Sequence, residues 1–194
     1  RMAFTKGAGL AEVVVEQDER GRVKVNDYLQ TSVDNIYAIG DIINTPQLAH
    51  VASKEGLIAV DNILGAKEIP TYHAVPGCVY TNPEVASVGL TEADCAKKGI
   101  AYKKGTFDFK GLGKAQASGK IAGFVKVLTD ENDVIIGGSI VGAHATDMLQ
   151  VLTTATQLGL TAKQVGDCIF PHPTMSEAIM EALHDLHGMS VHKG

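Results

Sequence analysis

The stretch Phe170-Pro171-His172-Pro173-Thr174-Met175-Ser176-Glu177-Ala178 lies near the end of this 194-residue chain. Two prolines enclose His172, and Glu177 follows it after one short turn of chain. Apolar side chains at helical spacing predict an amphipathic helix from this point on: Ala178, Ile179, Ala182, Leu183 and Leu186. An imidazole transfers protons near neutral pH, and a carboxylate bonded to its other nitrogen would fix its tautomer and raise its basicity. The pattern therefore indicates an acid–base pair.

The same residues also allow a purely structural interpretation. Thr174-Met175-Ser176-Glu177 has the pattern of a capping box, in which Glu177 would bond the backbone at the start of its own helix. A single histidine in front of a helix is a common structural feature. The local chemistry leaves both alternatives open.

Three segments of the chain resemble one enzyme family. The segment from His172 to Ala178 resembles the C-terminal signature of the flavoprotein disulfide reductases. Thr31-Ser32-Val33-Asp34-Asn35-Ile36-Tyr37-Ala38-Ile39-Gly40-Asp41 resembles their second flavin-binding fingerprint, and residues 80–92 resemble the start of their dimerisation (interface) domain. The Met-Ser-Glu-Ala continuation after Thr174 is more similar to the branch that oxidises dihydrolipoyl groups than to the glutathione reductases.

The segment before Asp41 carries a ligand-binding pattern of its own. Residues 36–39 form a wholly apolar run, typical of a parallel strand buried on both faces. Gly40 would let a ligand approach the backbone, and Asp41 would lie beyond the carboxyl end of the strand, where open α/β sheets bind ligands. The resemblance implies that Asp41 bonds the ribityl chain of FAD. It also implies that the start of the next helix faces the flavin, which gives the remaining cofactor-binding residues: Gln47, Leu48, Ala49 and His50. At His50 we expect backbone N–H groups and the helix dipole to act, rather than the imidazole.

The pattern of apolar and turn residues predicts an α+β fold. We expect a hairpin within residues 13–25, helices over 48–64 and 146–158, and short helices starting at Thr91 and Thr161. The predicted inward positions of the two long helices are Leu48, Ala52, Ala59 and Ile63, and Met148, Leu152, Ala155 and Leu158. The expected strands of an antiparallel sheet are 78–80, 85–88, 101–109, 124–128 and 134–142, with a loop over 110–120. The resemblance makes residues 69–194 the dimerisation domain and residues 1–68 the C-terminal piece of an α/β FAD-binding domain.

Composition excludes several other classes of function. The formal net charge is −5 and no Lys/Arg cluster stands out, which argues against nucleic acid as a partner. No apolar run has membrane-spanning length. Cys78, Cys95 and Cys168 are widely spaced without a zinc-binding or C-x-x-C pattern, so we expect reduced cysteines, no metal site, and a cytoplasmic or mitochondrial-matrix location.

The resemblance implies a specific activity for the whole protein. A family member of this branch oxidises dihydrolipoyl groups with NAD through FAD and a redox disulfide, and this chain would supply the dimer interface, with His172 as base and Glu177 holding its ring. The expected partners are a second copy of the chain and, in a 2-oxo acid dehydrogenase complex, the lipoyl domain and the acyltransferase's subunit-binding domain. The sequence does not indicate which complex is served.

Departures from the family pattern limit these expectations. The chain has no G-x-G-x-x-G and no close cysteine pair, so alone it is expected to be inactive and to bind FAD weakly or not at all. Phe170 and Pro171 stand where the family commonly has a His-Ala pair. The alternatives are glutathione reductase or another disulfide reductase of the family, or a non-catalytic dimerisation or docking module. We also expect a cis peptide between His172 and Pro173, with Glu177 bonded to a His172 nitrogen rather than closing the capping box.

Overall fold

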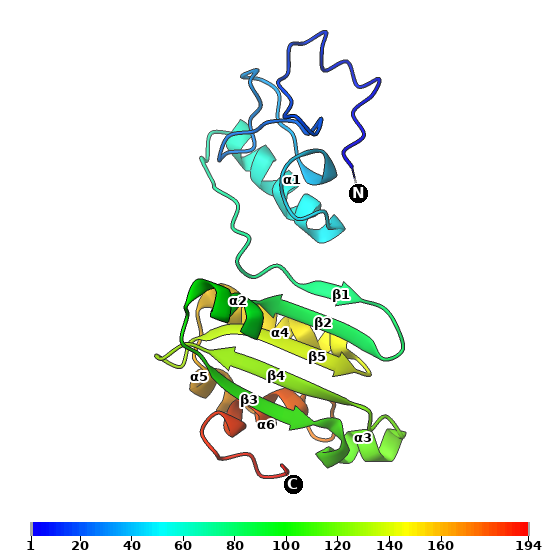
Figure 1. Cartoon of the computed structure of the whole chain (residues 1–194), viewed down its shortest axis with the longest axis vertical. Coiled ribbons are helices and arrows are strands. Elements are labelled where there is room, and N and C mark those ends of the chain that lie inside the picture. Colours follow the sequence, from blue (N-terminus) through cyan, green and yellow to red (C-terminus); the bar gives the residue numbers. More distant parts are fainter. Residues whose placement is uncertain (1, 194) are drawn as a thin grey trace. The chain divides into compact units, whose positions relative to one another are not determined.

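A computed structural model describes residues 2–193 of the chain, so that Arg1 and Gly194 lie outside the described residues. The chain forms two compact units, Arg1–Tyr72 and His73–Gly194, and each is described by itself (Figure 1). The predicted functional limits of the domains, 1–68 and 69–194, stay a prediction.

The first unit contains little regular structure apart from one long helix. A 3₁₀ turn, η1 (Gly40–Ile42), precedes α1 (Ala49–Ile63). The predicted helix over residues 48–64 is therefore confirmed. The remaining chain is held by turns and bridges around a small core, whose buried apolar residues are Val15, Val23, Leu29, Ala38, Ile43, Ile58 and Ala59.

Two strand predictions in the first unit were wrong. The expected hairpin in residues 13–25 is reduced to one bridge between Gln17 and Val23. Residues 36–39 form no strand, because their one bridge joins Tyr37 to Gln30 in antiparallel orientation. A strand needs a hydrogen-bonded neighbour along its length, and the described part of this unit offers no longer pairing than that.

The buried face of α1 also differs from the predicted one. The buried residues are Val51, Glu55, Ile58, Ala59 and Asn62. Of the four predicted inward positions only Ala59 is among them, and Ile63 is exposed. The prediction selected the wrong apolar stripe, since the apolar Val51 and Ile58 are buried instead. It also did not include Glu55 and Asn62, which are buried with hydrogen bonds to other parts of the unit.

The second unit is a five-stranded antiparallel sheet with helices, as the predicted α+β fold requires (Figure 1). The strand order is β1-β2-β5-β4-β3, and every neighbouring pair is antiparallel. The strands are β1 (Gly77–Val79), β2 (Glu84–Gly89), β3 (Lys103–Asp108), β4 (Gly123–Thr129) and β5 (Ile135–Gly142). The predicted β4–β5 hairpin is confirmed.

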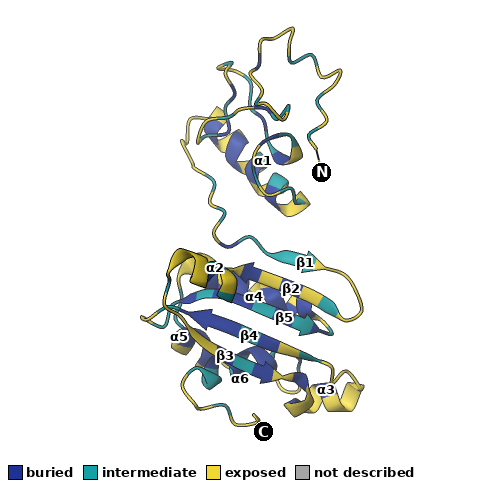
Figure 2. Cartoon of the chain, viewed as in Figure 1, coloured by how far each residue is buried: buried dark blue, intermediate teal, exposed yellow. Residues whose placement is uncertain are grey.

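Two helices pack on the sheet and bury its inner side (Figure 2). α4 (Ala145–Leu158) contacts β2 and β5, and α6 (Glu177–Asp185) contacts β3 and β4. The shorter helices are α2 (Glu92–Lys98), η2 (Phe109–Gly111), α3 (Gly113–Ser118) and α5 (Ala162–Gly166). Thr91 and Thr161 start α2 and α5 with capping boxes, as expected. The loop predicted over 110–120 was wrong, because η2 and α3 lie there.

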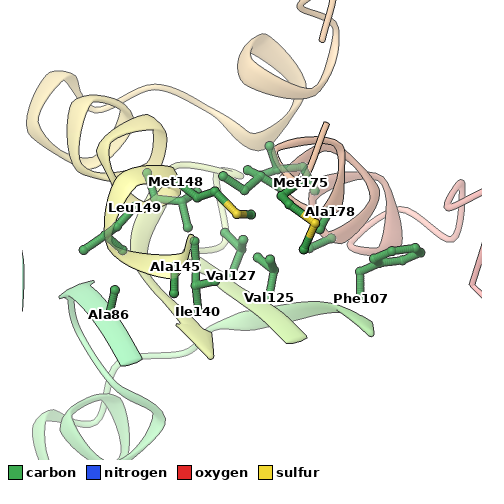
Figure 3. Close-up of a cluster of buried hydrophobic side chains, with 14 of the residues drawn as sticks. Ala86, Phe107, Val125, Val127, Ile140, Ala145, Met148, Leu149, Met175 and Ala178 are labelled. Atoms are coloured by element: carbon green, nitrogen blue, oxygen red, sulfur yellow. The ribbon is translucent and has the colours of Figure 1, made fainter. Parts of the chain in front are cut away.

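The core of the second unit fixes the position of α6. Figure 3 shows Met148 on α4, Met175 just before α6 and Ala178 in its first turn, together with Val125 and Ile140 of the sheet. All five side chains are buried. Burying a side chain of this size contributes about 1.5–3 kcal/mol, so the chain on either side of Glu177 is anchored firmly. Of the predicted inward positions on α4, Leu158 alone is exposed, in the last turn before Gly159 ends the helix.

Candidate active site

The segment around His172 lies on the second unit and leads directly into α6. The peptide bond between His172 and Pro173 is cis, which confirms the expectation. α6 begins at Glu177, after Ser176. The apolar face expected from the sequence is confirmed: Ala178, Ile179, Ala182 and Leu183 are buried, and Leu186 packs against the core.

His172 and Glu177 contact each other directly. His172 Nδ1 lies 2.8 Å from Glu177 Oε1. The imidazole side chain is 76% exposed, whereas the glutamate side chain is 14% exposed. The carboxylate therefore fixes one ring nitrogen from the protein side, and Nε2 is the nitrogen left for an external group.

The second oxygen of Glu177 bonds the backbone. The Thr174 N–H donates to Glu177 Oε2 at 2.8 Å, and the Thr174 hydroxyl donates to the Pro171 carbonyl oxygen at 2.7 Å. We expected Glu177 to bond a His172 nitrogen rather than to close the capping box, and both parts of this expectation are confirmed. The carboxylate has two oxygens and bonds both His172 and the Thr174 amide. The box is not closed, because the Thr174 hydroxyl bonds the Pro171 carbonyl oxygen and no side chain caps the start of α6.

The electrostatic environment keeps Glu177 ionised at neutral pH. Burial raises the pKa of Glu177, but the hydrogen bonds from the Thr174 amide and from His172 outweigh burial, so that the pKa lies below its ordinary value. The ionised carboxylate is placed to accept a hydrogen bond from the Nδ1–H of the ring. Nε2 then carries the free lone pair of the neutral ring, so it is the atom that can accept a proton from an external group.

A second carboxylate–imidazole pair lies one turn further along α6, and the sequence analysis missed it. Glu181 is buried, and its Oε1 lies 2.6 Å from His192 Nδ1. Its Oε2 accepts bonds from the Ser190 hydroxyl at 2.6 Å and from the backbone N–H groups of Val191 and His192. The spacing of Glu177 and Glu181, one helical turn apart, was the available signal.

The predicted flavin-binding residues lie together on the first unit. Asp41 is exposed in η1, directly after Gly40. The Gln47 side-chain amide donates to the Asp41 carbonyl oxygen at 3.2 Å. Leu48 flanks the start of α1, and Ala49 and His50 are exposed in its first turn. The structure thus brings all five predicted cofactor residues to one short region.

Gly40 packs against α1, and the start of α1 carries no side-chain cap. Gly40 has φ +70, and an added Cβ would lie 3.1 Å from the Ala52 Cβ. No side chain caps the start of α1, and its first turn holds no acidic residue. The N-terminal N–H groups of such a helix favour negative charge.

Neither a metal-binding cluster nor a membrane-spanning helix is found among the described residues. Within residues 2–193, no group of three or more His, Cys, Asp or Glu side chains is arranged as a metal site. None of the helices in this range has the length and apolar character needed to cross a membrane.

Two family models match the chain. Residues 75–183 match the pyridine nucleotide-disulphide oxidoreductase dimerisation domain, and residues 3–56 match the pyridine nucleotide-disulphide oxidoreductase model.

Curated relatives and solved structures carry related names. The chain is 44% identical to a mitochondrial dihydrolipoyl dehydrogenase of Caenorhabditis elegans over 94% of this chain and 37% of that protein. It is also 44% identical to the dihydrolipoyl dehydrogenase of Bacillus subtilis over 99% of this chain and 41% of that protein. The crystal structure of LpdA from Mycobacterium tuberculosis superposes with a TM-score of 0.89 at 27% identity, over 95% of this chain and 41% of that one.

These relatives do not favour the alternatives of a glutathione reductase or a non-catalytic module. The chain spans about two fifths of the length of the proteins it matches, as the covered shares of 37% and 41% show. The dimerisation-domain model covers more than half of the chain and includes both His172 and Glu177. The chain therefore belongs to the pyridine nucleotide-disulphide oxidoreductase family.

Proposed function

We propose that the chain is the C-terminal part of a dihydrolipoyl dehydrogenase, in which His172 is the acid–base residue at the dithiol and Glu177 orients it. The observation that carries this proposal is the bond between His172 Nδ1 and Glu177 Oε1 at 2.8 Å, with the ring otherwise exposed. The resemblance of the surrounding segment and the names of the relatives support the same assignment.

The chemistry of the pair follows from its protonation. His172 Nε2 accepts the proton of a dihydrolipoyl thiol as the S–H bond breaks, and the thiolate then attacks one sulfur of a redox disulfide. A mixed disulfide forms as the original S–S bond breaks and its other sulfur leaves as a thiolate. The proton stays on the imidazole while the ionised Glu177 balances its charge. In the reverse direction the imidazolium returns the proton to the departing thiolate.

A homodimer would bring the redox disulfide to His172. The dimerisation domain supports self-association of the chain. We propose that the disulfide is contributed by the partner subunit of the complete enzyme, since the imidazole side chain is 76% exposed and available to a group outside its own subunit. The lipoyl domain and the subunit-binding domain of a 2-oxo acid dehydrogenase complex are the proposed further partners, in the cytoplasm or the mitochondrial matrix.

FAD is the cofactor that the first unit would help to hold. When bound, FAD accepts the electron pair of the dithiol and passes it to NAD. The residues present fit such a role: Asp41 offers an exposed carboxylate directly after Gly40, and the start of α1 is free of acidic side chains and of a side-chain cap. We propose that Asp41 and Gln47–His50 form the part of the flavin site that lies on this chain.

Replacing His172 by glutamine in the complete enzyme tests the proposal. Loss of a general base lowers rates by about 10²–10⁴-fold, so flavin reduction by dihydrolipoamide should slow by that factor. Flavin reduction by NADH needs no thiol deprotonation and should be unchanged. Equal rates of flavin reduction by dihydrolipoamide in both proteins, measured by stopped-flow absorbance of the flavin, would contradict the assigned role.

A further inference from the structure

Glu55 is a buried carboxylate in the first unit with no role in the proposed chemistry. It lies in the middle of α1 and is 1% exposed. Among the described residues no cationic side chain forms a salt bridge with it, and its two oxygens accept hydrogen bonds from different parts of the chain. A carboxylate this deeply buried is stable only where its hydrogen-bond donors are well placed.

The first donor is the backbone of Gly40. Its N–H donates to Glu55 Oε2 at 2.7 Å. Gly40 has φ +70, a conformation that side-chain-bearing residues rarely adopt, and it immediately precedes Asp41. The bond therefore fixes the peptide from which Asp41 projects.

Small residues of α1 allow this turn to lie directly against the helix. An added Cβ at Gly40 would come within 3.1 Å of the Ala52 Cβ, and one at Gly56 within 3.4 Å of Ile39 Cδ1. Residues 39–40 thus pack against Ala52, Glu55 and Gly56 of α1, and Glu55 accepts the hydrogen bond from the Gly40 N–H.

The second donor is the last residue of the unit. The Tyr72 hydroxyl donates to Glu55 Oε1 at 2.8 Å. Burial, together with the bond to Glu55, raises the pKa of Tyr72, so the hydroxyl keeps its proton and remains a donor. The next residue, His73, begins the second unit. One side chain therefore holds both the turn at Asp41 and the end of the unit.

We propose that Glu55 is a positioning residue of the flavin site, which fixes the direction of Asp41 through Gly40 and ties the connector at Tyr72 to the same helix. This inference rests on the proposed flavin role of Asp41. Asp41 would contact the cofactor, whereas Glu55 acts on it only through the backbone.

A matched control is available on the same helix. Asn62 is buried two turns further on and makes three bonds, to Tyr28 and Glu68, remote in sequence from Gly40. Asn62→Leu and Glu55→Leu both remove buried polar contacts from α1, so both should destabilise the unit. Only Glu55→Leu should disturb the turn at Asp41.

The experiment has two readouts. In the isolated chain, amide hydrogen exchange of Gly40 should accelerate at least about tenfold in Glu55→Leu and not in Asn62→Leu, since the hydrogen bond that protects this amide is lost only in the first variant. In the FAD-loaded complete enzyme, flavin dissociation should accelerate by about tenfold in Glu55→Leu alone. Glu55→Gln should restore both readouts, because its carbonyl accepts from Gly40 and its amide donates to the Tyr72 oxygen.

The other possible results for flavin dissociation each test the positioning role of Glu55. Equal flavin loss in Glu55→Leu and Asn62→Leu would overturn the inference, because it would show a general structural effect. Unchanged flavin dissociation in Glu55→Leu, with faster dissociation in Asp41→Ala, would overturn the inference and leave the proposed function standing. Unchanged dissociation in Asp41→Ala would refute the flavin role of Asp41 and the positioning role together. Gly40 exchange would then show separately whether Glu55 fixes the turn.

Discussion

Removing the carboxylate of Glu181 should release the C-terminal segment from α6. This buried side chain accepts four hydrogen bonds from residues 190–192: from the Ser190 hydroxyl and the His192 ring at 2.6 Å, and from the backbone N–H groups of Val191 at 2.9 Å and His192 at 3.3 Å. Glu181→Ala removes all four and leaves a buried space on α6.

The magnitude follows from how exposed the donors are. Bonds to a charged acceptor contribute about 1.5–3 kcal/mol each when a donor would otherwise stay buried and unpaired. Here Val191 and His192 are exposed and can bind water once released, so the four contributions do not add. We expect the free energy of unfolding of the second unit to fall by about 3 kcal/mol, in the range for breaking a buried charged contact.

The matched control is Lys193→Ala, which removes an ion pair between the same C-terminal segment and α6. Lys193 Nζ pairs with Asp185 Oδ2 on α6, and the lysine side chain is 40% exposed. Because exposed ion pairs contribute about 0–1 kcal/mol, Lys193→Ala should change stability little. Urea unfolding followed by far-UV circular dichroism measures both variants, and hydrogen exchange of residues 188–193 reports whether the segment is released.

The pH dependence provides a second check on Glu181. Burial raises the pKa of Glu181, but the bonds from Ser190, His192 and Val191 outweigh it and leave the pKa lowered. A lowered pKa gives stability that is full above the unfolded value near 4.3 and is lost as pH falls through the folded value. Glu181→Gln should therefore be less stable than the natural chain at pH 7, and the two should converge in acid. A loss in Glu181→Ala no larger than in Lys193→Ala, with no convergence in acid, would refute the reasoning.

Two further predictions concern Glu177 and a glycine of the sheet. The pKa of Glu177 is lowered, like that of Glu181, so the ionised carboxylate stabilises the folded chain above pH 4.5 and this stability is lost in acid. Glu177→Gln should therefore lower the free energy of unfolding at pH 7 more than at pH 3, as measured by urea unfolding. An equal loss at both pH values would contradict this prediction. Gly89→Ala should cost about 3 kcal/mol, because φ is +68 and the new Cβ would lie 2.3 Å from the Ile136 carbonyl oxygen. Gly99→Ala has φ +66 with open space around it and should cost only about 1–2 kcal/mol; equal losses would show that the contact with Ile136 is unimportant.

The second unit was predicted well because its signals are local. The hairpin of β4 and β5 needs only two apolar strands and the turn between them, and α4 needs only helical periodicity and a terminal glycine. The helix α3 was missed because glycines at both ends of residues 113–119 indicate a loop when the sequence is considered alone. Gly119 instead ends the helix in a left-handed conformation.

The first unit was predicted poorly because its structure depends on distant partners. An apolar run such as residues 36–39 becomes a strand only beside another strand, and the described residues of this unit give it a single bridge. Glu55 and Asn62 are polar, so periodicity placed them outward. Their polar groups are satisfied in the interior because Gly40 and Tyr72 donate to Glu55, and the Tyr28 carbonyl oxygen accepts from the Asn62 amide.

The candidate site shows why two interpretations of one motif can both hold. In the sequence, Glu177 is one residue, and bonding His172 or capping the backbone were alternatives. In the structure the two oxygens of the carboxylate divide these tasks, with Oε1 on the imidazole and Oε2 on the Thr174 amide. The backbone bond fixes the carboxylate, and the fixed carboxylate orients a ring that is otherwise exposed. Orientation of His172 therefore depends on the start of α6, so that a substitution at Glu177 changes helix stability and proton transfer together, whereas His172→Gln leaves the acceptor of the Thr174 amide in place.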